Sequence, residues 1–232
     1  MRAADPFEIS KNIYLVGSSE ITDSRDCAVY LIDLGELILV DAGAGPSAPQ
    51  IVRNIERVGQ DPTRLSTVII THCHVDHSGG ARLFQKRFGA RLVMHEQDAK
   101  AVEKGDVRMT AALWYSLPFE PTPVDIKLSG QEQTLTFGSY SIACLHTPGH
   151  TPGSISLCLD LGGKRFLFGQ DIHGPFHSDF GSDLVAWRES MQRLLALEAD
   201  VLCEGHFGVY QPKGQVSAYI EQYLKAYAEN GP

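Results

Sequence analysis

The sequence predicts one α/β domain over residues 1–232, built from two similar halves whose sheets stack face to face with helices outside. The first observation is that strand-like apolar runs alternate with amphipathic helical patterns in both halves. The second is a hydrophobic content of 43%, which supports a well-buried core. The third is that no linker, low-complexity segment or block of like charges divides the chain.

In the first half, three strand-like segments precede a regular alternation of helices and strands. Gly35 and Glu36 are expected to form the turn of a hairpin between the second and third strands. The helix that follows carries Ile51, Ile55 and Val58 on one face. The expected strands are residues 9–16, 28–33, 37–40, 66–70 and 91–94, and the expected helices are residues 48–58, 80–88 and 97–104.

The second half repeats this pattern with a run of strands followed by a helix, a strand and a closing helix. We assign the segment 124–128 to this half. The expected strands are residues 124–128, 133–137, 140–145, 154–159, 165–168 and 201–203, and the expected helices are residues 184–197 and 215–228. Two halves of this kind bury the most apolar surface when their sheets pack against each other.

Residues 106–123 do not fit the alternation, because apolar and aromatic side chains are dense there and prolines follow. Trp114 and Tyr115 stand at the centre of the segment, and Pro118, Pro121 and Pro123 interrupt regular structure. One interpretation is a helix packed on the core. The other is a lid or substrate-pocket insertion with an apolar inner wall.

Composition restricts the partners of this protein. The net charge of −8 disfavours a general nucleic-acid binder, since phosphate contacts need lysine and arginine. No apolar run reaches the length of a membrane span, and residues 1–6 do not have the pattern of a secretory signal. Five scattered cysteines without a CxxC pair indicate reduced thiols in a cytoplasmic protein. We therefore expect a small-molecule substrate, with homo-oligomerisation left open.

Four metal-ligand side chains lie together in the segment that follows the apolar run 66–70. His72 and His74 are two residues apart on extended backbone, so they project to the same side and can bind one ion. Asp76 and His77 come where the chain bends into a helix, so they point elsewhere and can serve a second ion. Imidazole combined with carboxylate suits zinc, iron or manganese. A helix-capping aspartate among surface histidines does not explain four such residues so close together.

Three more candidate ligands lie beside strands later in the chain. His150 stands in a tight turn formed by Pro148, Gly149, Pro152 and Gly153, just before a strand. Asp171 and His206 each follow a strand and have glycine neighbours. A carboxylate has two oxygens, so Asp171 can bridge two ions.

Five further polar residues near these positions have more than one interpretation. Asp41 is either a turn former or a carboxylate that steadies a ligand loop. For His95 we favour a structural strand-end residue over a ligand, and His146 is expected either to support a ligand or to be structural. For His173 and His177 we favour incidental positions on a surface loop, with contact to substrate as the alternative.

The pattern His72-X-His74-X-Asp76-His77, followed by His150, Asp171 and His206, resembles that of the metallo-β-lactamase superfamily. The resemblance spans nearly the whole chain and implies a four-layer αββα sandwich with metal ions at one edge of the sheets. It implies that one ion is bound by His72, His74 and His150, and a second by Asp76, His77 and His206. Asp171 would bridge the two ions, and Asp41 matches the supporting aspartate of the family.

This resemblance implies a dinuclear metallohydrolase with two divalent metal ions, zinc first, with iron or manganese as alternatives. Two ions about 3.5–4 Å apart share a water and lower its pKa from about 15.7 toward roughly 7. The bridging hydroxide would attack an electron-poor carbonyl, and Asp76 would pass a proton to the leaving group. The expected catalytic residues are therefore Asp76 and Asp171.

In length and ligand set the chain resembles glyoxalase II-like and lactonase-like hydrolases. This resemblance implies that the substrate is a small thioester, lactone or ester. Glyoxalase II has a helical C-terminal domain that binds glutathione, whereas the chain after His206 holds one expected helix. This difference puts glutathione thioesters in doubt. Alternatives are a persulfide dioxygenase-like oxidoreductase with one iron, a small metal-dependent endoribonuclease, and a metal-stabilised binding protein. Metal content and cleavage of single-stranded RNA would separate them.

Overall fold

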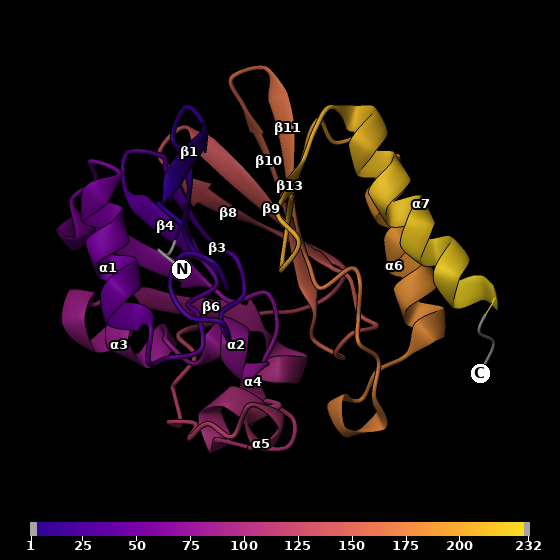
Figure 1. The fold of residues 1–232 in the computed structure, drawn as a ribbon, viewed down its shortest axis with the longest axis horizontal. Coiled ribbons are helices and arrows are strands. Elements are labelled where there is room, and N and C mark those ends of the chain that lie inside the picture. Colours follow the sequence, from indigo (N-terminus) through magenta and orange to yellow (C-terminus); the bar gives the residue numbers. More distant parts are fainter. Residues whose placement is uncertain (1–3, 230–232) are drawn as a thin grey trace.

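The computed structural model describes residues 4–229 and shows two sheets that face each other between two layers of helices (Figure 1). One sheet has seven strands in the order β1-β2-β3-β4-β5-β6-β7, and the other has six in the order β13-β12-β11-β10-β9-β8. The predicted αββα sandwich is therefore confirmed. Met1, Arg2 and Ala3, part of the segment that we expect not to be a secretory signal, lie outside the described residues.

The first sheet changes from antiparallel to parallel pairing at its fourth strand. Strands β1 to β4 pair antiparallel, whereas β4 to β7 are parallel. The strands are β1 Phe7–Ser10, β2 Ile13–Gly17, β3 Val29–Asp33, β4 Leu37–Val40, β5 Leu65–Ile69, β6 Arg91–His95 and β7 Ile126–Leu128. Because the carboxyl ends of β4, β5 and β6 meet at one edge, the segments that follow them lie close together.

The second sheet brings its two site-bearing strands to the same edge. Its strands are β8 Glu132–Phe137, β9 Tyr140–His146, β10 Ile155–Leu161, β11 Lys164–Gln170, β12 Val201–Glu204 and β13 Val209–Tyr210. Strands β8 to β11 are antiparallel, and β12 is parallel to β11. Asp171 and His206 therefore follow neighbouring strands that end side by side.

Apolar side chains divide between the two faces of each sheet. In β4, Ile38 and Val40 pack between the sheets, whereas Leu37 and Leu39 pack under the helices. A strand that is buried on both faces has a continuous apolar sequence. This explains why β4 lacks the polar alternation of a half-exposed strand.

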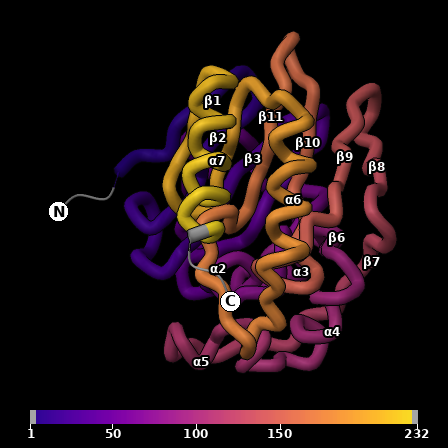
Figure 2. The backbone as a smooth tube through the Cα atoms, turned by 90° about the vertical axis from the view of Figure 1, so that its right-hand side faces the viewer, coloured from indigo at the N-terminus to yellow at the C-terminus, as the bar shows by residue number. Residues whose placement is uncertain are grey.

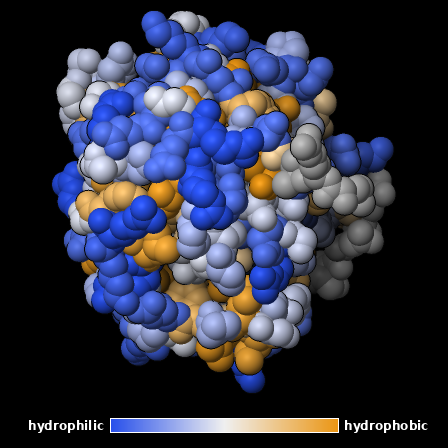
Figure 3. All heavy atoms as spheres, turned by 60° about the vertical axis from the view of Figure 1, so that its left-hand side comes forward, coloured by the Kyte–Doolittle hydropathy of each residue, from blue (hydrophilic) through white to orange (hydrophobic). Residues whose placement is uncertain are grey.

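Helices cover the outer face of each sheet. Helices α1 Ala48–Arg57, α3 Ala81–Phe88 and α4 Glu96–Lys104 pack on the first sheet, and α6 Leu184–Ala196 and α7 Lys213–Glu229 pack on the second. Figure 2 shows α6 and α7 side by side in front of the second sheet. The face that includes α1 and α3 is mostly hydrophilic with smaller hydrophobic areas (Figure 3), as expected for amphipathic helices in water. No described helix has the length and apolar character needed to cross a membrane.

The structure corrects the predicted elements in three places. The single strand expected at 9–16 is a hairpin of β1 and β2, because Asn12 adopts a left-handed φ of 71° and turns the chain. The segment 124–128 belongs to the first sheet, where β7 pairs with β6. Strand β13 and the short helices α2 Val75–Ser78, η1 Pro62–Arg64 and η2 Ser178–Phe180 were not predicted.

The expectation of a core-packed helix within residues 106–123 is wrong. Regular structure there is limited to α5, Ala112–Tyr115, of which only Ala112 is buried. Leu113 is 59% exposed and Trp114 is 53% exposed. Ser116, with a φ of 52°, ends the helix after one turn.

Candidate metal centre

Four loops at one edge of the two sheets bring together all seven side chains predicted as ligands. His72 and His74 follow β5, and Asp76 and His77 lie on α2. The other three come from the loop between β9 and β10 (His150), the end of β11 (Asp171) and the end of β12 (His206). The described residues of this edge form overlapping groups of potential ligand atoms.

The first group contains His72, His74, His150 and Asp171, whose ligand atoms all lie within 4.8 Å of one another. The His74 Nδ1 to His150 Nε2 distance is 3.0 Å. Asp171 Oδ2 lies 3.4 Å from His150 Nε2 and 3.9 Å from His72 Nε2. Two ligands of one tetrahedral zinc ion would stand about 3.3–3.6 Å apart, so these four atoms can surround a single ion.

The second group contains Asp76, His77 and His206. Asp76 Oδ2 lies 3.2 Å from His206 Nε2 and 3.5 Å from His77 Nε2, and the two Nε2 atoms are 3.3 Å apart. Asp171 reaches this group as well, with Oδ1 3.2 Å from His77 Nε2 and Oδ2 3.4 Å from His206 Nε2. Asp171 therefore lies between the two groups.

Unpaired buried atoms test whether these residues suit metal ions. His72 Nε2 and Asp76 Oδ1 are buried and have no hydrogen-bond partner among the described residues. An unsatisfied buried polar group costs about 1–3 kcal/mol, and a bound cation would remove that cost. Nitrogen and carboxylate donors together suit zinc, iron or manganese. The residues present fit divalent metal ions.

The protonation states of two histidines also favour cation binding. Burial lowers the pKa of His74 to about 3 and that of His150 to about 4, with neighbouring imidazoles contributing. Both rings are therefore neutral at pH 7. A metal ligand must be in this form, because the protonated imidazole has no free lone pair.

Groups outside the predicted ligand set hold two of the predicted ligand side chains in position. Asp41 Oδ2 lies 2.8 Å from His77 Nδ1, and Asp41 Oδ1 accepts a 2.8 Å bond from the backbone N–H of Thr71. Asp41 also has a left-handed φ of 62°, so it is both a turn former and a support for the ligand loop. His150 Nδ1 lies 2.8 Å from the carbonyl of Pro175, which leaves Nε2 free to face the centre.

Asp98 on α4 was missed by sequence analysis. Its buried carboxylate accepts bonds from the Cys73 backbone N–H at 2.9 Å, the Thr151 hydroxyl at 2.7 Å and the Gly153 backbone N–H at 2.7 Å. It therefore joins the histidine-rich turn to the His150 loop. The one available signal was its position on the helix face that carries Val102, where a carboxylate needs a buried partner.

Glu204 was also missed, and it changes the interpretation of His173. Its buried carboxylate accepts bonds from the backbone N–H groups of His206 and Phe207 at 2.6 and 2.8 Å, and it lies 2.9 Å from His173 Nδ1. The ring centroids of His173 and His206 are 5.2 Å apart. His173 is therefore not an incidental surface residue.

The remaining histidines behave as structural groups. His95 and His146 stack with ring centroids 3.9 Å apart, and His146 Nε2 lies 2.8 Å from the Pro152 carbonyl. The partly exposed His177 packs against Trp114 at 5.0 Å. None of these three belongs to the groups of ligand atoms among residues 4–229.

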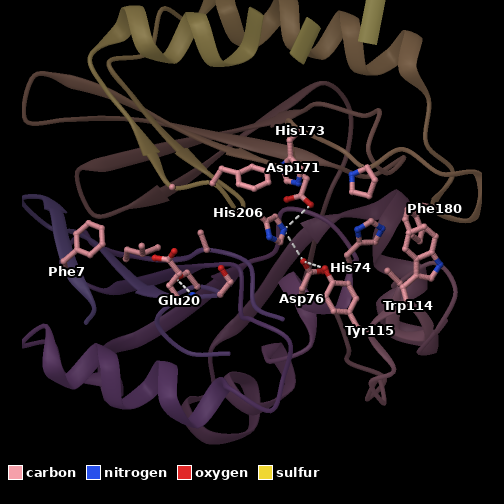
Figure 4. Close-up of a pocket in the computed structure, with 18 residues that line it drawn as sticks. Phe7, Glu20, His74, Asp76, Trp114, Tyr115, Asp171, His173, Phe180 and His206 are labelled. Atoms are coloured by element: carbon pink, nitrogen blue, oxygen red, sulfur yellow. Dashed lines mark hydrogen bonds and ion pairs between the residues drawn. The ribbon is translucent and has the colours of Figure 1, made fainter. Parts of the chain in front are cut away.

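A pocket of about 680 Å³ opens onto the centre (Figure 4). Tyr115 Oη donates a 3.0 Å bond to Asp76 Oδ2 at its inner end. Trp114 packs against Phe180 with ring centroids 4.7 Å apart. Residues of the 106–123 segment and of the loop after β11 thus form one wall of the pocket.

Comparison with known proteins decides the family. The family model described as the metallo-beta-lactamase superfamily matches residues 22–206. The chain belongs to the metallo-β-lactamase superfamily. The predicted resemblance is confirmed, and the His/Asp groups at the sheet edge fit the divalent metal binding of this superfamily of metallohydrolases.

Three curated relatives share parts of the chain. A probable metallo-hydrolase, MJ0888, of Methanocaldococcus jannaschii is 32% identical over 55% of this chain and 60% of its own length. The acyl-coenzyme A thioesterase MBLAC2 of Homo sapiens is 28% identical over 69% and 57% of the two chains. The hydroxyacylglutathione hydrolase GloC of Haemophilus influenzae is 26% identical over 82% and 89%. The chain spans about three fifths of the length of the first two curated relatives that it matches. The matches cover 60% and 62% of those two proteins.

Among solved structures, a metallo-beta-lactamase from Cronobacter sakazakii, a HARLDQ motif mutant, has a TM-score of 0.83 at 25% sequence identity. The match covers 98% of this chain and 96% of the other. The two proteins therefore share the whole sandwich.

Proposed function

We propose that this protein is a dinuclear metallohydrolase that cleaves a small thioester, lactone or ester. The observation that carries the proposal is that Asp171 lies between two groups of ligand atoms, each large enough for one ion. In this proposal His72, His74 and His150 hold one ion, and Asp76, His77 and His206 hold the other. A thioesterase and a hydroxyacylglutathione hydrolase among the relatives support this choice of reaction.

Divalent ions, zinc first, would supply a Lewis acid and make hydroxide available at neutral pH. Asp171 keeps both sites at a fixed separation, because each of its oxygens faces a histidine nitrogen. Asp76 faces the pocket and accepts the Tyr115 Oη–H bond, so its carboxylate could take the proton that the attacking water loses and return it to the leaving group. Trp114 and Phe180 line the same pocket.

We also propose that residues 106–123 are a substrate-pocket insertion with the position of a lid. Ala111, Trp114 and Tyr115 line the pocket, whereas Leu113 on the same helix does not. A short helix with little burial has few contacts that resist movement. The segment is therefore suited to close over a bound substrate.

The cytoplasm is the compartment that we propose for this protein. All five cysteines are free thiols, and four of them are buried. An oxidising compartment favours disulfides, so free thiols fit a reducing one. Thiol titration of the denatured protein, purified without reductant, should give five thiols per chain, and paired cysteines would contradict this assignment.

Metal analysis combined with a substrate panel tests the proposed activity. We expect two divalent ions per chain and hydrolysis of members of a panel of thioesters, lactones, simple esters and β-lactams. A panel without turnover by the metal-loaded protein would overturn the proposal. One iron per chain with oxygen uptake on a persulfide would favour the oxidoreductase alternative instead.

A further inference from the structure

The pocket extends beyond the metal centre in two opposite directions. Figure 4 shows Trp114 and Phe180 at one end and Phe7 and Glu20 at the other, with Asp76 and the rest of the centre between them. A substrate whose reacting carbonyl lies at the centre therefore has room for a group on each side. We call the part of the pocket from Phe7 to Phe207 the outer arm. Phe7 and Glu20 lie at its far end, and Phe207, whose ring centroid is 4.6 Å from that of His173, borders the centre. The same pocket is also lined by Leu15, Ser18, Ser19, Ala28 and Gly208.

The outer arm offers apolar surface to a ligand. Phe7 is 49% exposed and Phe207 is 56% exposed, although both are large aromatic side chains. Leu15, which pairs with Phe7, and Ala28, whose backbone N–H donates to the Gly205 carbonyl, add to the apolar lining. Exposed aromatic side chains that border a concave pocket are typical of ligand contacts.

The charge of the pocket restricts that ligand. Among the described residues that line the pocket there is no lysine and no arginine. Apart from the proposed metal ligands, its one carboxylate is Glu20, for which the described part of the chain shows no ion pair. Proteins recognise phosphate and carboxylate groups mainly with arginine, lysine and aligned backbone N–H groups.

Four described basic side chains of the same half lie outside this pocket lining. Arg82, Lys86 and Arg87 line a separate groove along α3. Arg25, which follows the outer-arm loop in sequence, is held by Asp23 through two bonds of 2.8 and 2.9 Å. Among residues 4–229, the pocket at the metal centre is thus lined by no lysine or arginine that could bind an anionic group.

We propose that the outer arm selects uncharged substrates and that Glu20 repels anionic ones. The inference rests on the proposed hydrolase function and names its substrate class: esters, thioesters or lactones with an apolar group and no phosphate or carboxylate. Thioesters of coenzyme A and of glutathione carry such anionic groups in their thiol part. The substrate of this protein therefore differs from those named for the thioesterase and glutathione-hydrolase relatives.

One acyl group on three thiols tests this selectivity. The acyl thioesters of N-acetylcysteamine, coenzyme A and glutathione have the same reacting bond and differ in charge. We expect kcat/KM for the N-acetylcysteamine thioester to exceed the other two by at least about tenfold at low salt. Added salt should reduce this ratio, because screening weakens the repulsion. Hydrolysis of all three with a preference for coenzyme A would overturn the inference and leave the hydrolase function intact.

The variant Glu20→Gln tests the role of the carboxylate directly. It should lower the ratio of kcat/KM between the neutral and the coenzyme A thioester by about threefold to tenfold, since a rim charge acts mainly on encounter with charged ligands. Glu56→Gln, an exposed glutamate on α1, is the matched control and should leave the ratio unchanged. A ratio that moves equally in both variants, or in neither, would contradict a role for Glu20.

Binding separates this inference from the proposed function. Thioether analogues of the N-acetylcysteamine and coenzyme A substrates cannot be hydrolysed, and fluorescence of Trp114 in a Trp187→Phe background reports their binding. The neutral analogue should bind the metal-loaded protein more tightly. If no member of the whole panel of thioesters, lactones and esters is hydrolysed, the hydrolase proposal fails. Tighter binding of the coenzyme A analogue would overturn the charge selectivity instead.

Discussion

At the scale of single residues, Asp171 has the position on which the two proposed metal sites depend. Its oxygens lie within 3.4 Å of histidine nitrogens from both groups of ligand atoms. Asp171→Ala should lower the bound metal from two ions to one or none, and activity should fall by orders of magnitude. Metal analysis of the purified variant measures this, with the more exposed Asp179→Ala as control. Two ions retained in Asp171→Ala would argue against a bridging role.

Tyr115 is the second residue whose contribution to activity can be tested with a single substitution. The hydroxyl donates to Asp76 Oδ2, and burial, reinforced by Asp76, raises the pKa of this phenol, so the hydroxyl keeps its proton at neutral pH. Tyr115→Phe removes one hydrogen bond to the carboxylate that we propose carries the proton. We expect kcat to fall about fivefold to tenfold with unchanged metal content, since one such bond is worth about 1 kcal/mol. Unchanged kcat would show that the phenol does not assist Asp76.

At the scale of elements, the loops of the site are held by buried carboxylates from neighbouring elements. Asp98 joins α4 to both the histidine-rich turn and the His150 loop through three accepted bonds. Asp98→Ala leaves two backbone N–H groups buried without a partner, so the free energy of unfolding should fall by about 2–4 kcal/mol. Asp98→Asn, which keeps one acceptor oxygen, should lose less.

Urea unfolding of the metal-free variants measures the Asp98 contribution. Removing metal separates the structural role of the carboxylate from any change in metal affinity. Equal unfolding midpoints for the wild-type chain and Asp98→Ala would contradict the contribution assigned to this link.

Helix α5 is the element through which substrate choice should be changed most easily. Trp114 forms part of the pocket wall and packs on Phe180, but it does not belong to the groups of ligand atoms. Trp114→Ala should shift the ranking of acyl groups in a substrate panel while metal content stays the same. Leu113→Ala, on the same helix and outside the pocket lining, is the matched control. An unchanged ranking would contradict the lid proposal.

At the scale of the whole molecule, the centre joins the two sheets. The Ala28 backbone N–H donates to the Gly205 carbonyl at 2.6 Å, and Tyr30 Oη donates to the Glu204 carbonyl at 2.6 Å. Both bonds connect the first sheet to the end of β12, next to His206. Metal ions that bind side chains from both halves should therefore stabilise the entire sandwich.

Removal of metal tests this coupling. A ligand that binds only the folded state raises its stability, and about 100-fold excess over Kd gives about 2.7 kcal/mol. For a chain of this size we expect chelation to lower Tm by about 5–10 °C. Calorimetry with and without a chelator measures the shift, and readdition of zinc should reverse it. The same Tm in both conditions would show that the halves hold together without the ions.

Prediction from sequence succeeded where structure depends on local pattern. The hairpin of β3 and β4 and the helix α1 are close to their expected ranges, because a turn signal and a helical period are properties of neighbouring residues. The partner of a strand is not such a property. For this reason β7 was assigned to the wrong half. The turn at Asn12 that separates β1 from β2 was missed although a turn is a local feature.

By itself, the sequence determined the family, the layered fold and the strand ends at which seven histidines and aspartates stand, because residue type, spacing and apolar period are written along the chain. Only the tertiary structure decided that Asp171 lies between two groups, that Asp98 and Glu204 hold the loops, and that Tyr115 bonds Asp76. These contacts join residues far apart in the sequence. Their geometry follows from how the two sheets and their loops pack together, and no local pattern records it.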